Sequence, residues 1–148
     1  MFDWKSIYER FAECHGASTP VQLAKKLNIH HSSVFQWRSG TKPIPWHRMR
    51  SIVIRNHISW DWLLEGTNSI KHRGDSLTDD FDWVGISRRF LSLFPDKRQT
   101  AIANQLGVAQ ETVSKWCRGE KHVPWERLKE ATVTFNIRWD WLIDGIDS

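Results

Sequence analysis

The chain has 148 residues, of which 40% are hydrophobic and 26% are charged, as in an ordinary globular protein. It contains no run of about 18 apolar residues that could span a bilayer, and Met1 to Lys5 lack the basic and apolar segments of a secretory signal, so we expect a cytoplasmic protein. The net charge of +4 suits a polyanionic partner but does not require one.

The sequence contains one unit twice. A shift of 79 positions aligns residues 2–66 with 81–145 without a gap, and 21 of the 65 pairs are identical. All ten tryptophans fall into this alignment as five pairs, and because a buried Trp removes about 150–250 Å² from water, we expect them to build the two cores. The pattern predicts one domain at 1–66, a polar, glycine-containing linker at 67–80 and a second domain at 81–148.

The first two helices of each copy are marked by apolar spacing and by a cap. The first helix is expected near 3–14 and near 82–94, with these residues on its buried face: Trp4, Ile7, Tyr8, Phe11, Trp83, Ile86 and Phe90. In the first copy, Thr19 is a capping residue, Pro20 stands at the first helical position and Gln22 completes a capping box. This second helix should end at Leu27.

A three-residue turn then leads into a third helix. The turn is expected at 28–30 and 107–109, and the helix at about 31–38 and 110–118. Such a short turn needs a residue with positive φ, which Gly107 adopts freely and Asn28 tolerates. In each copy, two apolar residues spaced three apart should anchor the third helix to the core: Val34 and Trp37 in the first copy, and Val113 and Trp116 in the second. Its opposite face should therefore point outward.

The rest of each copy is punctuated by glycine and proline. Gly40 and Gly119 should end the third helix, and Pro45 and Pro124 should start a fourth. A short fifth helix carries Trp-Asp-Trp at 60–62 and 139–141 and ends before a glycine. Strand signals are absent, so the predicted fold class is all-α with five helices in each copy.

Each copy resembles the N-terminal DNA-binding domain of phage CI-type (lambda-like) repressors. The resemblance rests on the helix, turn and helix, on Trp-x-x-Gly-x-x-x-x-Pro at 37–45 and 116–124, and on Trp-Leu-x-x-Gly at 62–66 and 141–145. It implies two tandem lambda-repressor-like helix-turn-helix domains that bind double-stranded DNA, with the third helix in the major groove. Members of that family commonly carry a C-terminal dimerisation and self-cleavage domain; because this chain stops three residues after Gly145, we expect no protease here.

The outward positions of the third helix are the candidates for reading bases. Gln pairs with adenine, Lys with guanine, Glu with cytosine, and Phe can contact a thymine methyl group. The candidates are His31, Ser32, Phe35 and Gln36 in the first copy and Gln110, Glu111, Ser114 and Lys115 in the second. Because none of these pairs is identical, we expect the two copies to prefer different base sequences.

The resemblance also implies phosphate contacts from the start of the second helix and from the loop after the third. The matching residues are Gln99, Arg118, Lys121, Arg38 and Lys42. Pro20 stands opposite Gln99, so the first copy either lacks that contact or replaces it with Thr19 or Gln22.

No cofactor or enzymatic activity is expected. There is no phosphate-binding glycine loop, nucleophile elbow or paired-carboxylate constellation. His30 and His31 lack further ligands at zinc-finger spacing, and Cys14 and Cys117, too few for a disulfide scaffold, should be free thiols.

The sequence leaves the type of partner and the oligomeric state open. The same fold could serve as a protein-interaction module, such as an antirepressor or an antitoxin-like adaptor, although an outer face of Gln, Lys, Arg, Ser and His favours DNA. The duplication implies that the second head is supplied in cis, so that one chain acts as a covalent pseudo-dimer, and a homodimer is possible in addition. Fourteen linker residues span about 20 Å as a coil and under about 50 Å extended, against about 34 Å between half-sites one helical turn apart.

Overall fold

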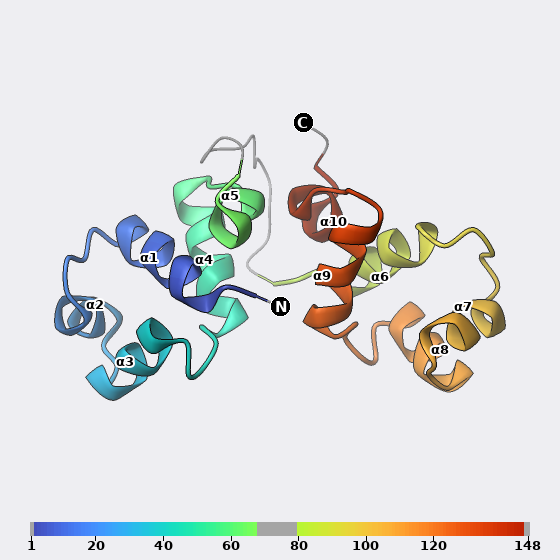
Figure 1. The fold of residues 1–148 in the computed structure, drawn as a ribbon, viewed down its shortest axis with the longest axis horizontal. Helices are drawn as coiled ribbons and strands as arrows, with labels where there is room; N and C mark the ends of the chain where they lie inside the picture. Colours follow the sequence, from blue (N-terminus) through green and yellow to red (C-terminus); the bar gives the residue numbers. More distant parts are fainter. Residues whose placement is uncertain (1, 68–79, 147–148) are drawn as a thin grey trace. The chain divides into compact units, whose positions relative to one another are not determined.

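The computed structural model describes residues 2–67 and 80–146, which form two compact units. Unit one, residues 2–67, contains α1 (Trp4–Cys14), α2 (Pro20–Leu27), α3 (His31–Ser39), α4 (Trp46–Asn56) and α5 (Trp60–Glu65) (Figure 1). Unit two, residues 81–146, contains α6 (Trp83–Ser92), α7 (Gln99–Leu106), α8 (Gln110–Cys117), α9 (Trp125–Thr134) and α10 (Trp139–Asp144). The all-α prediction is confirmed for these residues, and the expected linker, apart from Thr67 and Asp80, lies outside them.

Several helices begin and end where the punctuation predicts, whereas α6 ends at Ser92 and α8 at Cys117, before the expected 94 and 118. The backbone N–H of Gln22 donates to Oγ1 of Thr19 at 3.2 Å, while the Gln22 side chain accepts from the N–H of Ser18 at 2.8 Å. Pro20 is the first helical residue of α2. In the same way the side chains of Asp3 and Asp82 cap α1 and α6. These bonds satisfy amide donors that a helix start leaves unpaired.

An aromatic core forms in the same way in each unit. The ring of Phe11 packs edge-to-face on Trp37 with centroids 6.0 Å apart, and Phe90 packs on Trp116 at the same separation. Four tryptophans are buried: Trp37, Trp60, Trp116 and Trp139. The other six are only half-buried, which corrects the expectation that all ten build the cores: Trp4, Trp46, Trp62, Trp83, Trp125 and Trp141.

An arginine that the sequence analysis did not single out fixes the last helix of each unit. Nε of Arg10 donates to the carbonyl oxygen of Leu63 at 2.8 Å, and Nε of Arg89 donates to that of Leu142 at 2.9 Å. The last carbonyl groups of a helix lack partners within the helix. Arg10 therefore links α1 to α5, and Arg89 links α6 to α10. Arg10 and Arg89 are an identical pair of the repeat, which is the signal that could have found them.

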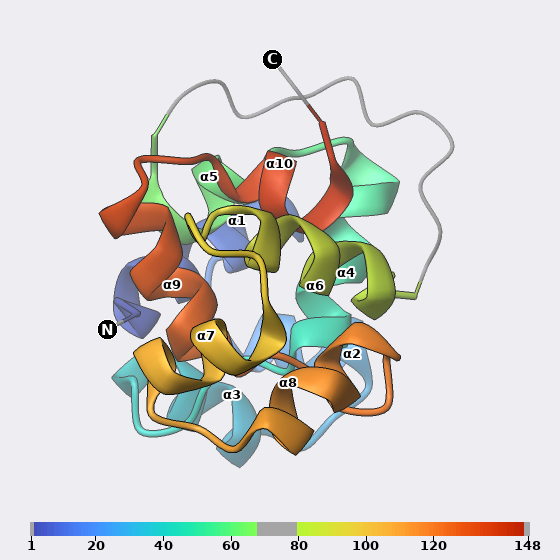
Figure 2. The ribbon, with the colours of Figure 1, turned by 90° about the vertical axis from the view of Figure 1, so that its right-hand side faces the viewer.

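This arrangement leaves the second and third helices at one end of each unit. Figure 2 faces unit two and shows α7 and α8 together at one end, α10 at the other, and α6 and α9 between them. No helix among the described residues is long and apolar enough to cross a membrane. Both cysteines are free thiols, as expected, and burial raises the pKa of Cys14 to about 11.

Candidate nucleic-acid interface

The second and third helices of each unit are joined by the same tight turn. Its first residue is left-handed in both units, Asn28 with φ 56° and Gly107 with φ 70°, as the three-residue spacing predicts. The backbone N–H of the next residue returns to the carbonyl of Ala24 at 3.1 Å or of Ala103 at 3.0 Å. These alanines are buried, so the small side chain lets the two helices approach closely. The left-handed turn residue and the small alanine therefore determine how α3 packs against α2 and how α8 packs against α7.

Both α3 and α8 are anchored on one side only. The anchoring residues are buried, as predicted: Val34, Trp37, Val113 and Trp116. Opposite them, the first turn of each helix is exposed at His31, Ser32, Gln110 and Glu111. A helix with one enclosed and one solvated face is suited to contact a macromolecule with its outer side.

In unit one, aromatic rings gather at the start of α3. The rings of His30 and His31 stack with centroids 4.4 Å apart, and His31 meets the ring of Phe35 edge-on at 6.0 Å. His30 also caps the helix, because its Nδ1 accepts from the backbone N–H of Ser32 at 3.1 Å. Phe35 is 43% exposed, whereas Gln36 is half-buried. The candidate base-reading residues of this unit therefore form a partly aromatic surface.

In unit two, a candidate base-reading residue, Ser114, forms a hydrogen bond with a candidate phosphate-contacting residue, Gln99. The Ser114 hydroxyl donates to Oε1 of Gln99 at 2.6 Å, and the Gln99 Nε2 group lies 3.5 Å from Sγ of Cys117. Gln99, Ser114 and Lys115 are half-buried, so Ser114 is less accessible than its place on the helical wheel predicts. The side-chain amide of Gln99 thus joins the start of α7 to α8.

The positive charge of Arg118 is shared between two carboxylates. Its Nε donates to Oε2 of Glu120 at 2.6 Å, and its Nη2 lies 3.5 Å from Oε1 of Glu111. The hydrogen bond to Glu120 raises the pKa of this guanidinium further above its ordinary range. A base contact by Glu111 and a phosphate contact by Arg118 therefore require this ion pair to open or to be shared with DNA.

The end of α3 and the loops after α3 and α8 carry basic side chains that form no ion pair with the described residues. The backbone N–H of Lys42 returns to the Gln36 carbonyl at 3.2 Å, and that of Lys121 returns to the Lys115 carbonyl at 3.4 Å. The two loops therefore have the same hydrogen-bonding pattern. The side chains of Arg38, Lys42 and Lys121 are exposed and form no ion pair or side-chain hydrogen bond with the residues that the structure describes. They are available to an anionic partner.

The starts of α2 and α7 differ between the units. Thr19 and Gln22, the candidate replacements for Gln99, are exposed but already hydrogen-bonded within the capping box. At the position of Thr19, unit two has Arg98, whose Nη2 lies 2.6 Å from Asp96. Hydrogen bonds from Arg98 lower the pKa of the Asp96 carboxyl to about 2. Arg98 is thus a further exposed cation beside the candidate site.

Comparison of the chain with protein-family models, with curated proteins and with solved structures gives no match in any of the three.

Proposed function

We propose that the chain binds double-stranded DNA in a sequence-specific manner through two helix-turn-helix heads, one in each unit, and acts as a phage-type transcriptional repressor. In this proposal α3 and α8 are the recognition helices that enter the major groove. The loops that carry Lys42 and Lys121 contact the phosphate backbone.

One observation carries the proposal. In both units the second helix of a close pair is held by two buried residues on its inner side and is followed by an exposed lysine, while its outer side is polar in unit two and polar with the exposed ring of Phe35 in unit one. A protein that reads DNA needs both parts, since phosphate contacts fix register and base-edge contacts supply specificity. An exposed recognition helix next to free cations offers the two kinds of contact from one rigid element.

The difference between the two outer faces supports one chain acting on an asymmetric site. The anchors of α3 and α8 are identical in the two units, whereas the exposed residues at the helix starts differ in type. His31 and Ser32 in unit one correspond to Gln110 and Glu111 in unit two. Because Gln and Glu present different donors and acceptors from His and Ser, the two half-sites should differ in sequence.

Selection from a random duplex pool tests the proposal. The intact chain should enrich one site with two unlike half-sites, and that site placed in a promoter should lower expression of a reporter when the protein is present. Failure to enrich any duplex at low salt would contradict DNA binding, and enrichment of a perfect palindrome would contradict the pseudo-dimer. Raised reporter expression would contradict repression while leaving DNA binding intact.

A second candidate, docking of another protein by unit one, is favoured by a specific observation. Val21 on α2 is 47% exposed and Phe35 on α3 is 43% exposed, and aromatic side chains are enriched in protein–protein interfaces. The variant Phe35→Gln separates the two functions. If Phe35 contacts a thymine methyl group, the variant should change the base preferred at one position of the selected site. If it serves only a protein partner, the selected site and its affinity should stay the same.

A further inference from the structure

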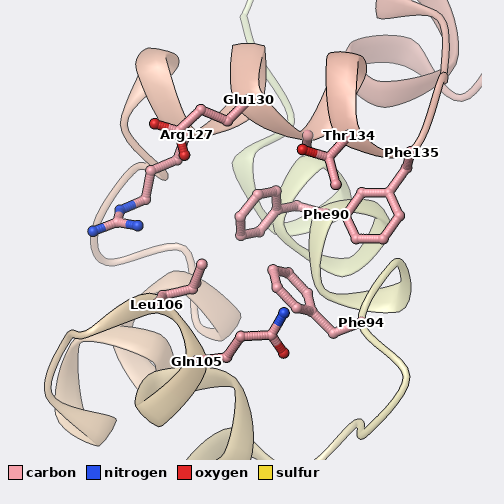
Figure 3. A pocket seen from close by; sticks show the side chains of 9 residues that line it. Phe90, Phe94, Gln105, Leu106, Arg127, Glu130, Thr134 and Phe135 are labelled. Carbon is pink, nitrogen blue, oxygen red and sulfur yellow. The ribbon is translucent and has the colours of Figure 1, made fainter.

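Unit two contains a pocket away from the outer face of α8. It has a volume of about 150 Å³ and lies between α6, α7 and α9. Figure 3 shows the rings of Phe90, Phe94 and Phe135 together, with Leu106 and Gln105 rising from α7 and Arg127 at the edge on α9. Phe90, Phe94 and Ala131 are buried, so the inner wall of the pocket is apolar, whereas Gln105, Glu130 and Thr134 at its rim are exposed.

The three phenylalanines form a preorganised aromatic wall. Phe94 packs edge-to-face on Phe90 with centroids 5.4 Å apart, and on Phe135 with centroids 6.0 Å apart. Both separations lie in the range of about 4.5–7 Å that favours such pairs. Another aromatic ring entering the pocket would extend the series with the same geometry, and no ring would need to leave its neighbours.

Comparison with unit one shows which substitutions distinguish this region. Ala131 occupies the position of Ile52 in unit one, and Ile52 is likewise buried. Phe94 occupies the position of His15, whose ring packs on Phe11 at 4.9 Å. Compared with unit one, unit two therefore has a smaller side chain on α9, Ala131, and an additional phenylalanine ring, Phe94.

We propose that this pocket is a binding site for a small molecule with a single aromatic ring and a hydroxyl group. An enclosed cavity of about 150 Å³ in another protein takes up benzene, so a pocket of this volume has room for one six-membered ring, although the pocket in unit two is open to solvent at its rim. A buried hydroxyl needs a hydrogen-bond partner, and Gln105, Arg127 and Glu130 at the edge of the pocket supply both donors and acceptors. The pocket is too small to enclose a drug-sized molecule, which needs about 300 Å³ or more.

Phenol is the probe, and cyclohexanol is its control. Titration of the intact, ¹⁵N-labelled chain should shift the amide signals of α6, α7 and α9 and leave those of unit one in place. Intermolecular nuclear Overhauser effects should connect phenol protons to the rings of Phe94 and Phe135. A ligand this small should bind with a dissociation constant on the order of 1 mM. Cyclohexanol should bind several-fold more weakly, because it has the same size but lacks an aromatic ring.

Two variants on α9 test the location. Ala131→Ile introduces the residue that unit one carries and should weaken phenol binding at least about 10-fold, because close packing leaves no room for the ring. Val133→Ile adds a methylene group at a 70% exposed position of the same helix and should leave binding unchanged. Should Ala131→Ile unfold, the Overhauser contacts in the unaltered chain still decide the location.

Three results would overturn this inference: no saturable shifts in unit two, equal affinity for phenol and cyclohexanol, or equal phenol binding by the chain and a folded Ala131→Ile variant. None of these measurements involves DNA. The inference can therefore fail while the proposed function holds, and the reverse is equally possible.

Discussion

Arg89 and Leu142 are 53 residues apart in the sequence, yet Nε of Arg89 donates a hydrogen bond of 2.9 Å to the Leu142 carbonyl. Nη2 of the same guanidinium donates to the carbonyl of Ile143 at 2.8 Å. Burial lowers the pKa of Arg89, which shows that the charge is held in a partly desolvated place. One side chain of α6 therefore satisfies two terminal carbonyl groups of α10.

Arg89→Met should destabilise unit two, because Met preserves the apolar stem but leaves those two carbonyls without their donor. Hydrogen bonds from charged groups contribute about 1.5–3 kcal/mol each in favourable settings, and the partial exposure of Arg89 suggests a total loss of about 1–3 kcal/mol. Urea unfolding followed through the amide signals of α10 measures it. The control Arg88→Met, at an exposed neighbouring position, should change stability by less than about 0.5 kcal/mol. Equal effects of the two variants would refute this role of Arg89.

Unit one should lose stability on mild acidification because of His15. Burial, with help from the nearby charge of Lys26, lowers the pKa of His15 below its ordinary 6.5. Below pH 6.5 the unfolded chain then binds a proton more readily than the folded one, so stability falls as pH falls. The contribution is at most about 1.4 kcal/mol per pH unit.

The matched variant for this effect is His15→Phe, since unit two has Phe94 at the same position. Thermal unfolding of unit one between pH 7.5 and 5.5, both about one unit from the ordinary histidine pKa, should show a smaller acid-induced drop in the variant. An identical drop in the two proteins would show that His15 does not cause it.

Several helix ends could be predicted from the sequence because they have a local cause, whereas α7, α8 and α10 begin without a side-chain cap. Thr19 and Pro20 begin α2, Asn28 ends it, and α3 then runs from His31 to Ser39, one residue longer than expected. The duplication strengthened these predictions, because glycine, proline and apolar residues recur at matching positions of the second copy.

The partners of individual side chains could not be predicted in the same way. Gln99 and Ser114 are 15 residues apart, and their bond depends on the crossing of two helices. The ion pairs of Arg118 depend on rotamers, which residue spacing does not determine. Trp62 and Trp141 stay half-buried because a small core has too little volume to enclose five indoles.

Gln110 and Lys121 should have different effects on DNA binding. Gln110, exposed at the start of α8, is placed to read a base, whereas Lys121 in the following loop is placed to contact phosphate. Gln110→Ala should cost about 1–3 kcal/mol on the selected duplex and much less on random DNA. Lys121→Ala should weaken binding to both duplexes alike.

Fluorescence anisotropy with the two duplexes distinguishes these effects. Arg88→Ala is the control, because it removes an exposed positive charge from α6, outside the pair formed by α7 and α8. Similar losses on selected and random DNA for Gln110→Ala and Lys121→Ala would refute the assignment of separate base and phosphate contacts.

Cleaving the chain between the units should weaken binding to the full site. A protease site replacing residues 72–76 would free the two heads, and a tether of this length gives the second head an effective concentration in the millimolar range. Each severed head should bind at least about 100-fold more weakly than the intact chain. The affinity is measured before and after cleavage, with the folding of both halves checked by their amide spectra. If the severed mixture binds the full site as tightly as the intact chain, the pseudo-dimer model is contradicted and dimerisation of separate chains is favoured.

The salt dependence of duplex binding tests DNA recognition most directly. Each phosphate that a Lys or Arg neutralises contributes about −0.9 to the slope of log K against log salt concentration. With roughly six to eight contacts shared by the two heads, we predict a slope of about −5 to −7 for the selected duplex. A slope near zero, or no retardation of any duplex at low salt, would contradict binding of DNA by this protein.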